Sequence, residues 1–417
     1  MGVRPLRAVV KWLRDAPWIT PGRVSIYPKL FVVIYAISFV VWIAARHGMV
    51  DPKGTPIGVD FVNSWAGSHL ALSGHPQDVY SFSKIHAAER AAVNAPQVSI
   101  FGWYYPPTFL LVVLPLAMLP YLWALAAWIV TTGTAYLWML RKIAPCKQTL
   151  WLALGFPGTW INFLNGQNGF LSAALLGGGL AYLPERPVIA GTLFGLLVFK
   201  PQLGIFVPLV LLVARQWRCM LAAAASALGL MGLSLLLFGP NTWRTFFHSM
   251  SLPRILVLDQ GLIPYSYQQS VFAAMRLWNV PLQASYAIQA VTAMSAAAVL
   301  VWLWMGNCSY RLKAAAVVIC GLLATPYLFD YDLTTLGIAI AFLALEGMER
   351  GFLPYEKSTL ALAWLAPVLE RRVAGDSGIP LCALINIALL ALIAVRATRS
   401  ESAEITAAAG IRREAPT

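Results

Sequence analysis

The chain has 417 residues, of which 59% are apolar and 11% are charged. A soluble domain carries about 25% charged residues, and no single hydrophobic core holds so large an apolar surplus. The composition therefore excludes a soluble enzyme, and it excludes a disordered chain, whose hydrophobicity would be low. Because one membrane crossing takes about 20 residues, we predict an all-α polytopic membrane protein with about 11–13 transmembrane helices.

The formal net charge is +13, from 30 Lys and Arg against 17 Asp and Glu. When the N-terminus is placed inside and the helices alternate, most basic residues fall on the cytoplasmic side, as the positive-inside rule requires. No stripe of basic and aromatic residues suggests a groove for a polynucleotide. We therefore expect a multi-pass protein of the cytoplasmic (inner) membrane, surrounded by membrane lipids, with its long loops outside and no nucleic-acid partner.

The N-terminal part divides into a basic segment, a helix and a long loop. Residues 1–29 carry six basic residues and predict a cytoplasmic N-terminal segment. The predicted membrane domain covers 30–396, and its first helix spans about 30–46. The first outer loop, 47–106, holds two short amphipathic stretches suited to the bilayer surface. These stretches are 60–72 and 83–95.

The next apolar run, 107–140, is too long for one simple crossing. Pro115 and Pro120 predict a break into a short dipping element and a full helix. Two compact hairpins follow, and the first turns at residues 165–169. The second turns at Lys200 and the proline that follows it.

The second half of the membrane domain contains a helix over 219–238 and a second outer loop over 239–281. Further membrane segments are predicted at 282–305, 314–329, 333–346, 358–369 and 379–395. The charged connection Glu370–Arg372 is placed outside. The Ala-, Glu- and Arg-rich residues 397–417 predict a cytoplasmic disordered tail.

Cysteine and histidine spacing gives no sign of a metal site. None of the five cysteines lies in a long outer loop, and no pair has metal-ligand spacing. His69, His75 and His86 lie in the first outer loop but are not spaced as a helical metal pair. We expect no disulfide, no metal and no cofactor, and we interpret the histidines as surface or substrate-contacting residues.

Asp60 begins the first amphipathic stretch, in the sequence Gly-Val-Asp-Phe-Val-Asn-Ser-Trp. A carboxylate at a helix start either caps the helix by accepting backbone N–H groups or acts as a general base toward a hydroxyl. The outer side has few other acids, which favours the second interpretation.

Lys200 ends an apolar run on the side of the membrane where basic residues are scarce. It is either a lysine that snorkels from a helix end or a cation for an anionic lipid phosphate. Arg244, Arg254 and Arg276 of the second outer loop are further candidates for such a phosphate.

Three further sets of residues lie at predicted outer turns. Tyr105 belongs either to an interfacial aromatic belt or to a wall for a sugar ring or an isoprenoid chain. Gln167 and Asn168 form a tight polar turn or line a polar notch with donors. Asp330 and Asp332 are too divergent on a helix for a shared-proton dyad, so they form a hydrogen-bonded turn or bind sugar hydroxyls or a cation.

Short motifs follow one another in a set order between residues 57 and 335. They are Gly74-His75-Pro76 with Val79-Tyr80 after the Asp60 segment, Tyr105-Pro106-Pro107 before Leu114-Pro115-Leu116, Gly166-Gln167-Asn168, Ala190-Gly191 before Phe199-Lys200-Pro201, Gln269-Ser270-Val271 before Arg276, and Thr325-Pro326-Tyr327 before Asp332. In this order and spacing they resemble glycosyltransferase family 87 of the GT-C superfamily. One departure is Phe329-Asp330-Tyr331-Asp332, where some relatives carry histidine.

The resemblance implies a GT-C bundle that moves a hexose, mannose in known members, from a polyprenyl-phosphate-linked donor at the outer face. The acceptor would be a hydroxyl of a glycolipid or glycan. The family's catalytic aspartate falls on Asp60, which would be the general base. We place the donor phosphate at Lys200 and Arg254. The sugar and acceptor contacts that we predict are Tyr105, Gln167, Asn168, Asp332 and His75.

Two other functions remain open at the level of sequence. A transporter or flippase of lipid-linked sugars would need polar groups through the bilayer, whereas the ionisable residues here gather at one face. The same fold could also use another polyprenyl-phosphate sugar, such as glucose or arabinose. No nucleotide-binding motif is present, so a lipid-linked donor is expected in either transferase.

Overall fold

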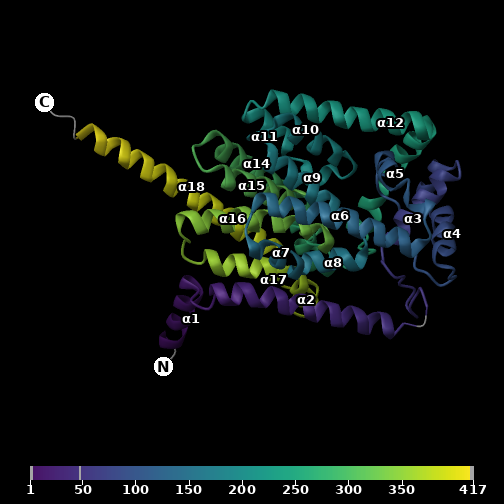
Figure 1. The fold of residues 1–417 in the computed structure, drawn as a ribbon, viewed down its shortest axis with the longest axis horizontal. Coiled ribbons are helices and arrows are strands. Elements are labelled where there is room, and N and C mark those ends of the chain that lie inside the picture. Colours follow the sequence, from purple (N-terminus) through teal and green to yellow (C-terminus); the bar gives the residue numbers. More distant parts are fainter. Residues whose placement is uncertain (1–2, 47, 414–417) are drawn as a thin grey trace.

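The computed structural model describes residues 3–46 and 48–413. Residues 1–2, 47 and 414–417, which belong to the predicted N-terminal segment, first outer loop and tail, lie outside the described residues. Within the described ranges every regular element is helical, apart from two isolated bridges. α1 (Val3–Asp15) and α18 (Leu381–Arg413) lie at one end of the molecule, whereas α3 (Phe61–Leu72) and α4 (Phe82–Val93) lie at the other, which we call the loop end (Figure 1).

The order of elements follows the predicted pattern of short and long helices. The first part of the chain contains α1 (Val3–Asp15), α2 (Pro21–Ala44), α3, η1 (Pro76–Tyr80), α4, α5 (Pro107–Val113), η2 (Leu116–Met118), α6 (Tyr121–Ile143), α7 (Lys147–Gly155), α8 (Pro157–Asn165), α9 (Gly169–Tyr182), α10 (Pro187–Leu196), η3 (Leu197–Phe199), η4 (Pro201–Gly204) and α11 (Val207–Val213). The second part contains α12 (Trp217–Ser249), η5 (Pro253–Asp259), η6 (Tyr265–Tyr267), α13 (Val271–Leu277), α14 (Leu282–Met305), α15 (Tyr310–Ala324), η7 (Asp330–Thr335), α16 (Leu336–Arg350), α17 (Glu356–Ser377) and α18 (Leu381–Arg413).

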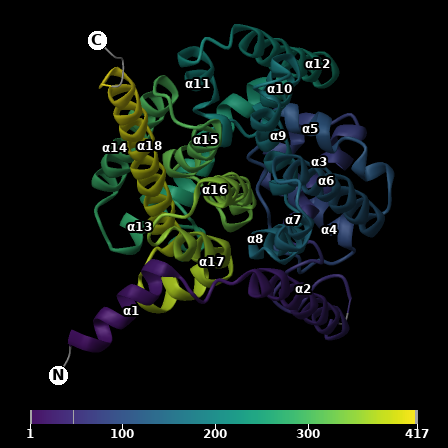
Figure 2. The same ribbon diagram turned by 60° about the vertical axis from the view of Figure 1, so that its left-hand side comes forward.

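The all-α polytopic membrane fold is confirmed. Six helical stretches of the described chain are long and apolar enough to cross a membrane, and four shorter apolar helices accompany them. α2 and α12 lie on opposite sides of the bundle (Figures 1 and 2) and are the least buried of the six. Their apolar side chains face outward, as lipid-facing helices require.

Prolines break the helices largely where the sequence predicts. The run from Pro107 is divided at Pro115 and Pro120 into α5, η2 and α6. The first arm of the first hairpin is divided as well, because Pro157 begins a new helix, α8, after α7. Since proline cannot donate a backbone hydrogen bond, each break leaves a short helix that ends inside the bundle.

Helix ends account for the differences from the predicted boundaries. α2 begins at Pro21 rather than near residue 30, because the Thr20 side chain caps it and proline suits the first helical position. α17 runs through the charged Glu370–Arg372 to Ser377. α18 continues as helix to Arg413, where the sequence predicts a disordered tail; its Ala, Glu and Arg content has high helix propensity.

α12 extends eleven residues beyond its predicted end at residue 238. Gly239, with φ of 74°, and Pro240 produce a kink there. The segment after the kink, Asn241–Ser249, belongs to the predicted second outer loop. It carries Trp243, Phe246 and Phe247 to the loop end, where they line a cavity.

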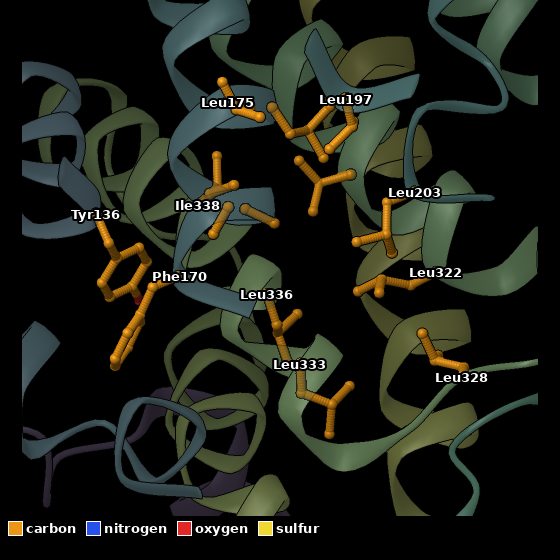
Figure 3. Close-up of a cluster of buried hydrophobic side chains, with 14 of the residues drawn as sticks. Tyr136, Phe170, Leu175, Leu197, Leu203, Leu322, Leu328, Leu333, Leu336 and Ile338 are labelled. Carbon is orange, nitrogen blue, oxygen red and sulfur yellow. The ribbon is translucent and has the colours of Figure 1, made fainter. Parts of the chain in front are cut away.

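The core lies between α6, α9, α15 and α16 and encloses η7. Figure 3 shows a cluster of buried side chains drawn from these helices and from η3, η4 and η7. Tyr136 and Phe170 stack with ring centroids 5.4 Å apart, and Leu333 and Leu336 anchor η7 below them. η7 is therefore a polar turn held rigidly by apolar neighbours on both sides.

α10 and α12 pack with their backbones in close approach. A Cβ added to Gly191 would collide with the Cys219 carbonyl of α12, and one added to Gly195 would collide with Ser226 and the Ala223 carbonyl. Small residues four positions apart let two helices approach in a membrane. The Ala190-Gly191 motif therefore has a packing role at this contact.

We expect Gly191→Leu to destabilise the protein by about 1–3 kcal/mol, because the larger side chain forces α10 and α12 apart. Gly229→Leu on α12 is the matched control, since nothing lies within 4 Å of its added Cβ. Thermal unfolding in detergent, followed by tryptophan fluorescence, measures the effect. Equal melting temperatures for the two variants would show that this contact does not hold the helices together.

Candidate active site

A cavity of about 860 Å³ opens at the loop end of the molecule. One part of its lining is polar and charged, and the other is apolar and formed largely by α12 and η5. The polar part includes Asp60, Asn63, Tyr105, Asn165, Gln167, Lys200, Asp330 and Arg371. The apolar part includes Val198, Met231, Trp243, Phe246, Phe247, Met250, Pro253, Val257 and Leu262.

Asp60 is presented to the cavity by a tight turn before α3. Gly58 and Val59 both have positive φ, 82° and 39°. A β-branched residue rarely adopts that conformation, and such strain is typical of functional sites. The Asp60 side chain accepts no capping hydrogen bond from α3. Of the two interpretations of this residue, the N-cap is therefore wrong for its carboxylate.

The carboxylate of Asp60 is held instead by the turn between α8 and α9. Gln167 Nε2 donates a hydrogen bond of 3.0 Å to Asp60 Oδ2. Gly166 makes this possible, because its added Cβ would lie 2.7 Å from Phe61 Cβ and 3.2 Å from the Gly58 carbonyl oxygen. Close backbone approach thus brings two segments about a hundred residues apart within hydrogen-bond distance.

Tyr105 fixes the orientation of Gln167. The Tyr105 hydroxyl donates to Gln167 Oε1 at 3.1 Å, and the Asn168 backbone N–H donates to the same oxygen at 3.1 Å. With its oxygen held on that side, the Gln167 amide must direct its NH₂ group to Asp60. Within the described residues no hydrogen bond engages Asp60 Oδ1, which leaves that oxygen to accept a proton.

The position of Asp60 raises its pKa to about 6. Burial is the main cause, and the negative charge of Asp330 adds to it. The hydrogen bond from Gln167 and the positive charges of Arg371 and Lys200 act in the opposite direction. Asp60 is thus mostly ionised near neutral pH, with a pKa close enough to neutrality for proton transfer.

Lys200 lies at the cavity wall but is almost fully buried, with 2% of its surface exposed. Its ammonium forms an ion pair with Asp332 and donates to Asn168 Oδ1 at 2.7 Å. The Tyr331 ring lies 4.9 Å from it. Asn168 and Asp332 are therefore behind the wall, and they hold Lys200 rather than facing the cavity themselves.

Arg371 and Asp330 form a second charged pair, at the cavity surface. Arg371 Nη2 lies 2.5 Å from Asp330 Oδ2, and the guanidinium lies 4.3 Å from the Tyr267 ring centroid. The sequence reasoning did not assign a role to Arg371. A usable signal existed, since Arg371 is a basic residue on the side where such residues are scarce, as Lys200 is.

A buried carboxyl, that of Glu89, accepts hydrogen bonds from two residues of the cavity lining. Glu89 Oε1 accepts a hydrogen bond of 3.0 Å from Asn63 Nδ2, and Glu89 Oε2 accepts one of 3.2 Å from the Phe101 backbone N–H. Burial raises the pKa of Glu89 to about 8. His86 Nδ1 lies 3.3 Å from the same carboxyl, so this histidine contacts Glu89 and does not line the cavity.

Two predicted site residues lie away from these groups. His75 is exposed at the start of η1 and is not part of the cavity lining. Arg254 is also absent from the lining, its side chain is 64% exposed, and it pairs with Asp259 at 3.7 Å. The structure thus brings together Asp60, Tyr105, Gln167, Asn168, Lys200 and Asp332, but neither His75 nor Arg254.

The protein is thus an all-helical membrane protein with a cavity at one end, and a carboxylate, Asp60, lines that cavity. The sequence model of glycosyltransferase family 87 matches residues 103–326, more than half of the chain. The chain therefore belongs to glycosyltransferase family 87 and is a membrane glycosyltransferase. Searches of curated proteins and of solved structures find no match. Asp60 precedes the matched residues, whereas Lys200 lies within them.

We expect Lys200→Met to destabilise the protein by about 3–5 kcal/mol, because it leaves the Asp332 carboxylate buried without its cation. Asp332→Asn removes that charge while keeping an acceptor for the Phe329 backbone N–H. The double variant Lys200→Met/Asp332→Asn should recover much of the loss. Thermal unfolding of both single variants and the double variant gives the coupling. Additive losses would contradict a stabilising ion pair.

Proposed function

We propose that this glycosyltransferase moves a hexose, with mannose as the proposed sugar, from a polyprenyl phosphate to a hydroxyl of a lipid- or glycan-linked acceptor. The site works at the outer face of the cytoplasmic membrane. Asp60 is the general base.

One observation carries the proposal: Asp60 is the unpaired carboxylate of the cavity. Of the two carboxylates in the lining, Asp330 is paired with Arg371, whereas no ion pair in the described residues engages Asp60. A base must be free to take a proton, and its pKa must lie near the working pH. The value of about 6 meets that requirement.

The mixed lining supports a lipid-linked donor. A sugar and a phosphate need the polar groups around Asp60, and an isoprenoid chain needs an apolar surface that continues into the membrane. The kinked α12 supplies an apolar part of the lining through Met231, Phe246 and Phe247. The lining would thus suit both halves of an amphiphilic substrate.

The proposed step is an inverting transfer from a β-linked donor. Asp60 Oδ1 takes the proton of the acceptor hydroxyl as that oxygen attacks the anomeric carbon. The bond between this carbon and the phosphate oxygen breaks, and the electron pair leaves with the polyprenyl phosphate. Gln167 and Tyr105 hold the base in place and face the sugar. The proton on Asp60 then passes to solvent.

Lys200 has a positioning role in this proposal. Its ammonium is surrounded by Asp332, Asn168 and the Tyr331 ring, so it orders the groups behind the wall. It also adds positive potential below the cavity. Arg254 lies outside the lining and takes no part in the proposed step.

We expect Asp60→Asn to lower transfer by about 10²–10⁴-fold, because asparagine keeps the size and the hydrogen bond from Gln167 but cannot take the proton. Asp78→Asn is the control, since Asp78 lies in the same loop, pairs with Lys84 and is not part of the cavity lining. Purified protein is incubated with a membrane lipid extract as the source of acceptor and with polyprenyl-phosphate mannose, glucose and arabinose in turn, and the newly glycosylated acceptor is measured.

Each outcome of this assay decides one point. Near-normal transfer by Asp60→Asn would refute the base role. Transfer from glucose or arabinose but not mannose would change the donor while leaving the mechanism. Movement of labelled donor across sealed vesicles, without a new glycosidic bond, would favour a flippase instead.

We expect kcat/KM to fall about tenfold per pH unit below pH 6, because protonated Asp60 cannot accept a proton. Asp330→Asn should move this acidic limb to lower pH, since the charge of Asp330 raises the pKa of Asp60. Initial rates measured from about pH 4.5 to about pH 8, a range that brackets the pKa of about 6, would give both profiles. An unchanged limb in Asp330→Asn would mean that another group controls it.

A further inference from the structure

The cavity lining contains two cations, Lys200 and Arg371, and they differ in how many of their N–H donors remain free for a ligand. An ammonium has three N–H donors, and Asn168, Asp332 and the Tyr331 ring surround that of Lys200. A ligand in the cavity would have to displace these partners. Lys200 is therefore poorly placed to receive an incoming anion.

Arg371 is placed differently. Its side chain is 45% exposed and it lines the cavity. A guanidinium has five N–H donors in a fixed fork, and a single carboxylate engages at most one edge of it. Asp330 is the hydrogen-bonding partner of Arg371 among the described residues. Donors on the remaining edge are left for a ligand.

The neighbours of Arg371 hold this fork in one orientation. Asp330 is buried, and its Oδ1 accepts a hydrogen bond of 2.9 Å from the Tyr331 backbone N–H, so the carboxylate itself cannot turn away. The Tyr267 ring lies against the guanidinium and limits its motion through a cation–π contact. A fixed, partly satisfied arginine is a pre-organised site for a tetrahedral oxyanion.

We propose that Arg371 is the direct ligand of the donor's lipid phosphate, with Asp330 and Tyr267 as its positioning residues. This assignment rests on the proposed function. As the glycosidic bond breaks, the electron pair moves onto the phosphate oxygen, and the phosphate gains one negative charge. A fixed guanidinium stabilises that charge more than it stabilises the bound donor, which lowers the barrier.

The surroundings indicate a lipid phosphate rather than a free one. Tyr267, whose ring lies against Arg371, follows Leu262 and Ile263 in the chain, and all three line the cavity. An inorganic phosphate has no use for these side chains, whereas the first isoprene units of a polyprenyl phosphate would cover them.

Binding of a polyprenyl phosphate to the full-length protein in detergent tests the proposal without any turnover. We expect Arg371→Gln to weaken binding by about 10–100-fold, the effect of losing charge-assisted hydrogen bonds. Arg371→Lys should retain part of the affinity. Arg372→Gln is the matched control: it is the next residue, its side chain is 86% exposed, and it pairs with Asp376. Its affinity should equal that of the wild type.

Further arms separate folding and ligand source from the proposed role. Arg371→Gln/Asp330→Asn removes the pair without leaving a buried charge, and it should bind as weakly as Arg371→Gln. A polyprenol without phosphate should bind all variants alike. Equal affinity of Arg371→Gln and wild type for the polyprenyl phosphate overturns the proposal. Weak anion binding lies in about the millimolar range. If inorganic phosphate at such concentrations displaces the lipid, the site binds free phosphate and the assignment to a lipid phosphate is wrong.

The two proposals fail in different ways. If wild type binds the polyprenyl phosphate through Arg371 but transfers no sugar from any polyprenyl-phosphate donor, the proposed function falls and the phosphate site stands. If wild type transfers sugar and Arg371→Gln binds and transfers normally, the phosphate assignment falls and the proposed function stands.

Discussion

The buried charge of Lys200 is the constraint on which the arrangement of the site depends. An ammonium removed from water costs several kcal/mol unless anions and acceptors surround it. Asp332 of η7 and Asn168 at the start of α9 must therefore come to the break between η3 and η4. One charge thus fixes three segments that are far apart in sequence. Because η7 also carries Asp330, the same ion pair sets where the partner of Arg371 stands.

Close backbone approach supplies what the ion pair does not. Gly166 lets the turn after α8 lie against the Gly58 carbonyl, so Gln167 reaches Asp60. In the same turn, Gly169 lies against Asn162 and the Tyr331 carbonyl, which brings η7 to the start of α9. A side chain at either glycine would separate segments that the site needs in contact. The polar turn of residues 165–169 therefore connects Asp60 to the buried charge of Lys200.

Most of the fold could be predicted from sequence because long apolar runs and prolines are local signals. Pro115 and Pro120 mark their breaks without any tertiary information. The kink at Gly239 does not end α12, which continues as helix to Ser249, and composition alone does not reveal this. Of the site, Asp60 and Lys200 could be selected because charges are scarce on their side. The pairing of Arg371 with Asp330 could not, since it joins α17 to η7 only through the folded core.

The pairing of charges also explains why a cavity so poor in ionisable groups is suited to chemistry. Lys200 is paired with Asp332 behind the cavity wall, and Arg371 is paired on one edge with Asp330, so each cation is partly neutralised. Of the two carboxylates in the cavity lining, only Asp60 keeps an oxygen without a partner among the described residues, because Gln167, a neutral donor, holds its other oxygen. A cation in place of Gln167 would lower the pKa of Asp60 and so make its carboxylate a weaker base. The neutral amide therefore orients the carboxylate and leaves its second oxygen without a partner among the described residues, and Arg371 keeps donors that Asp330 does not occupy.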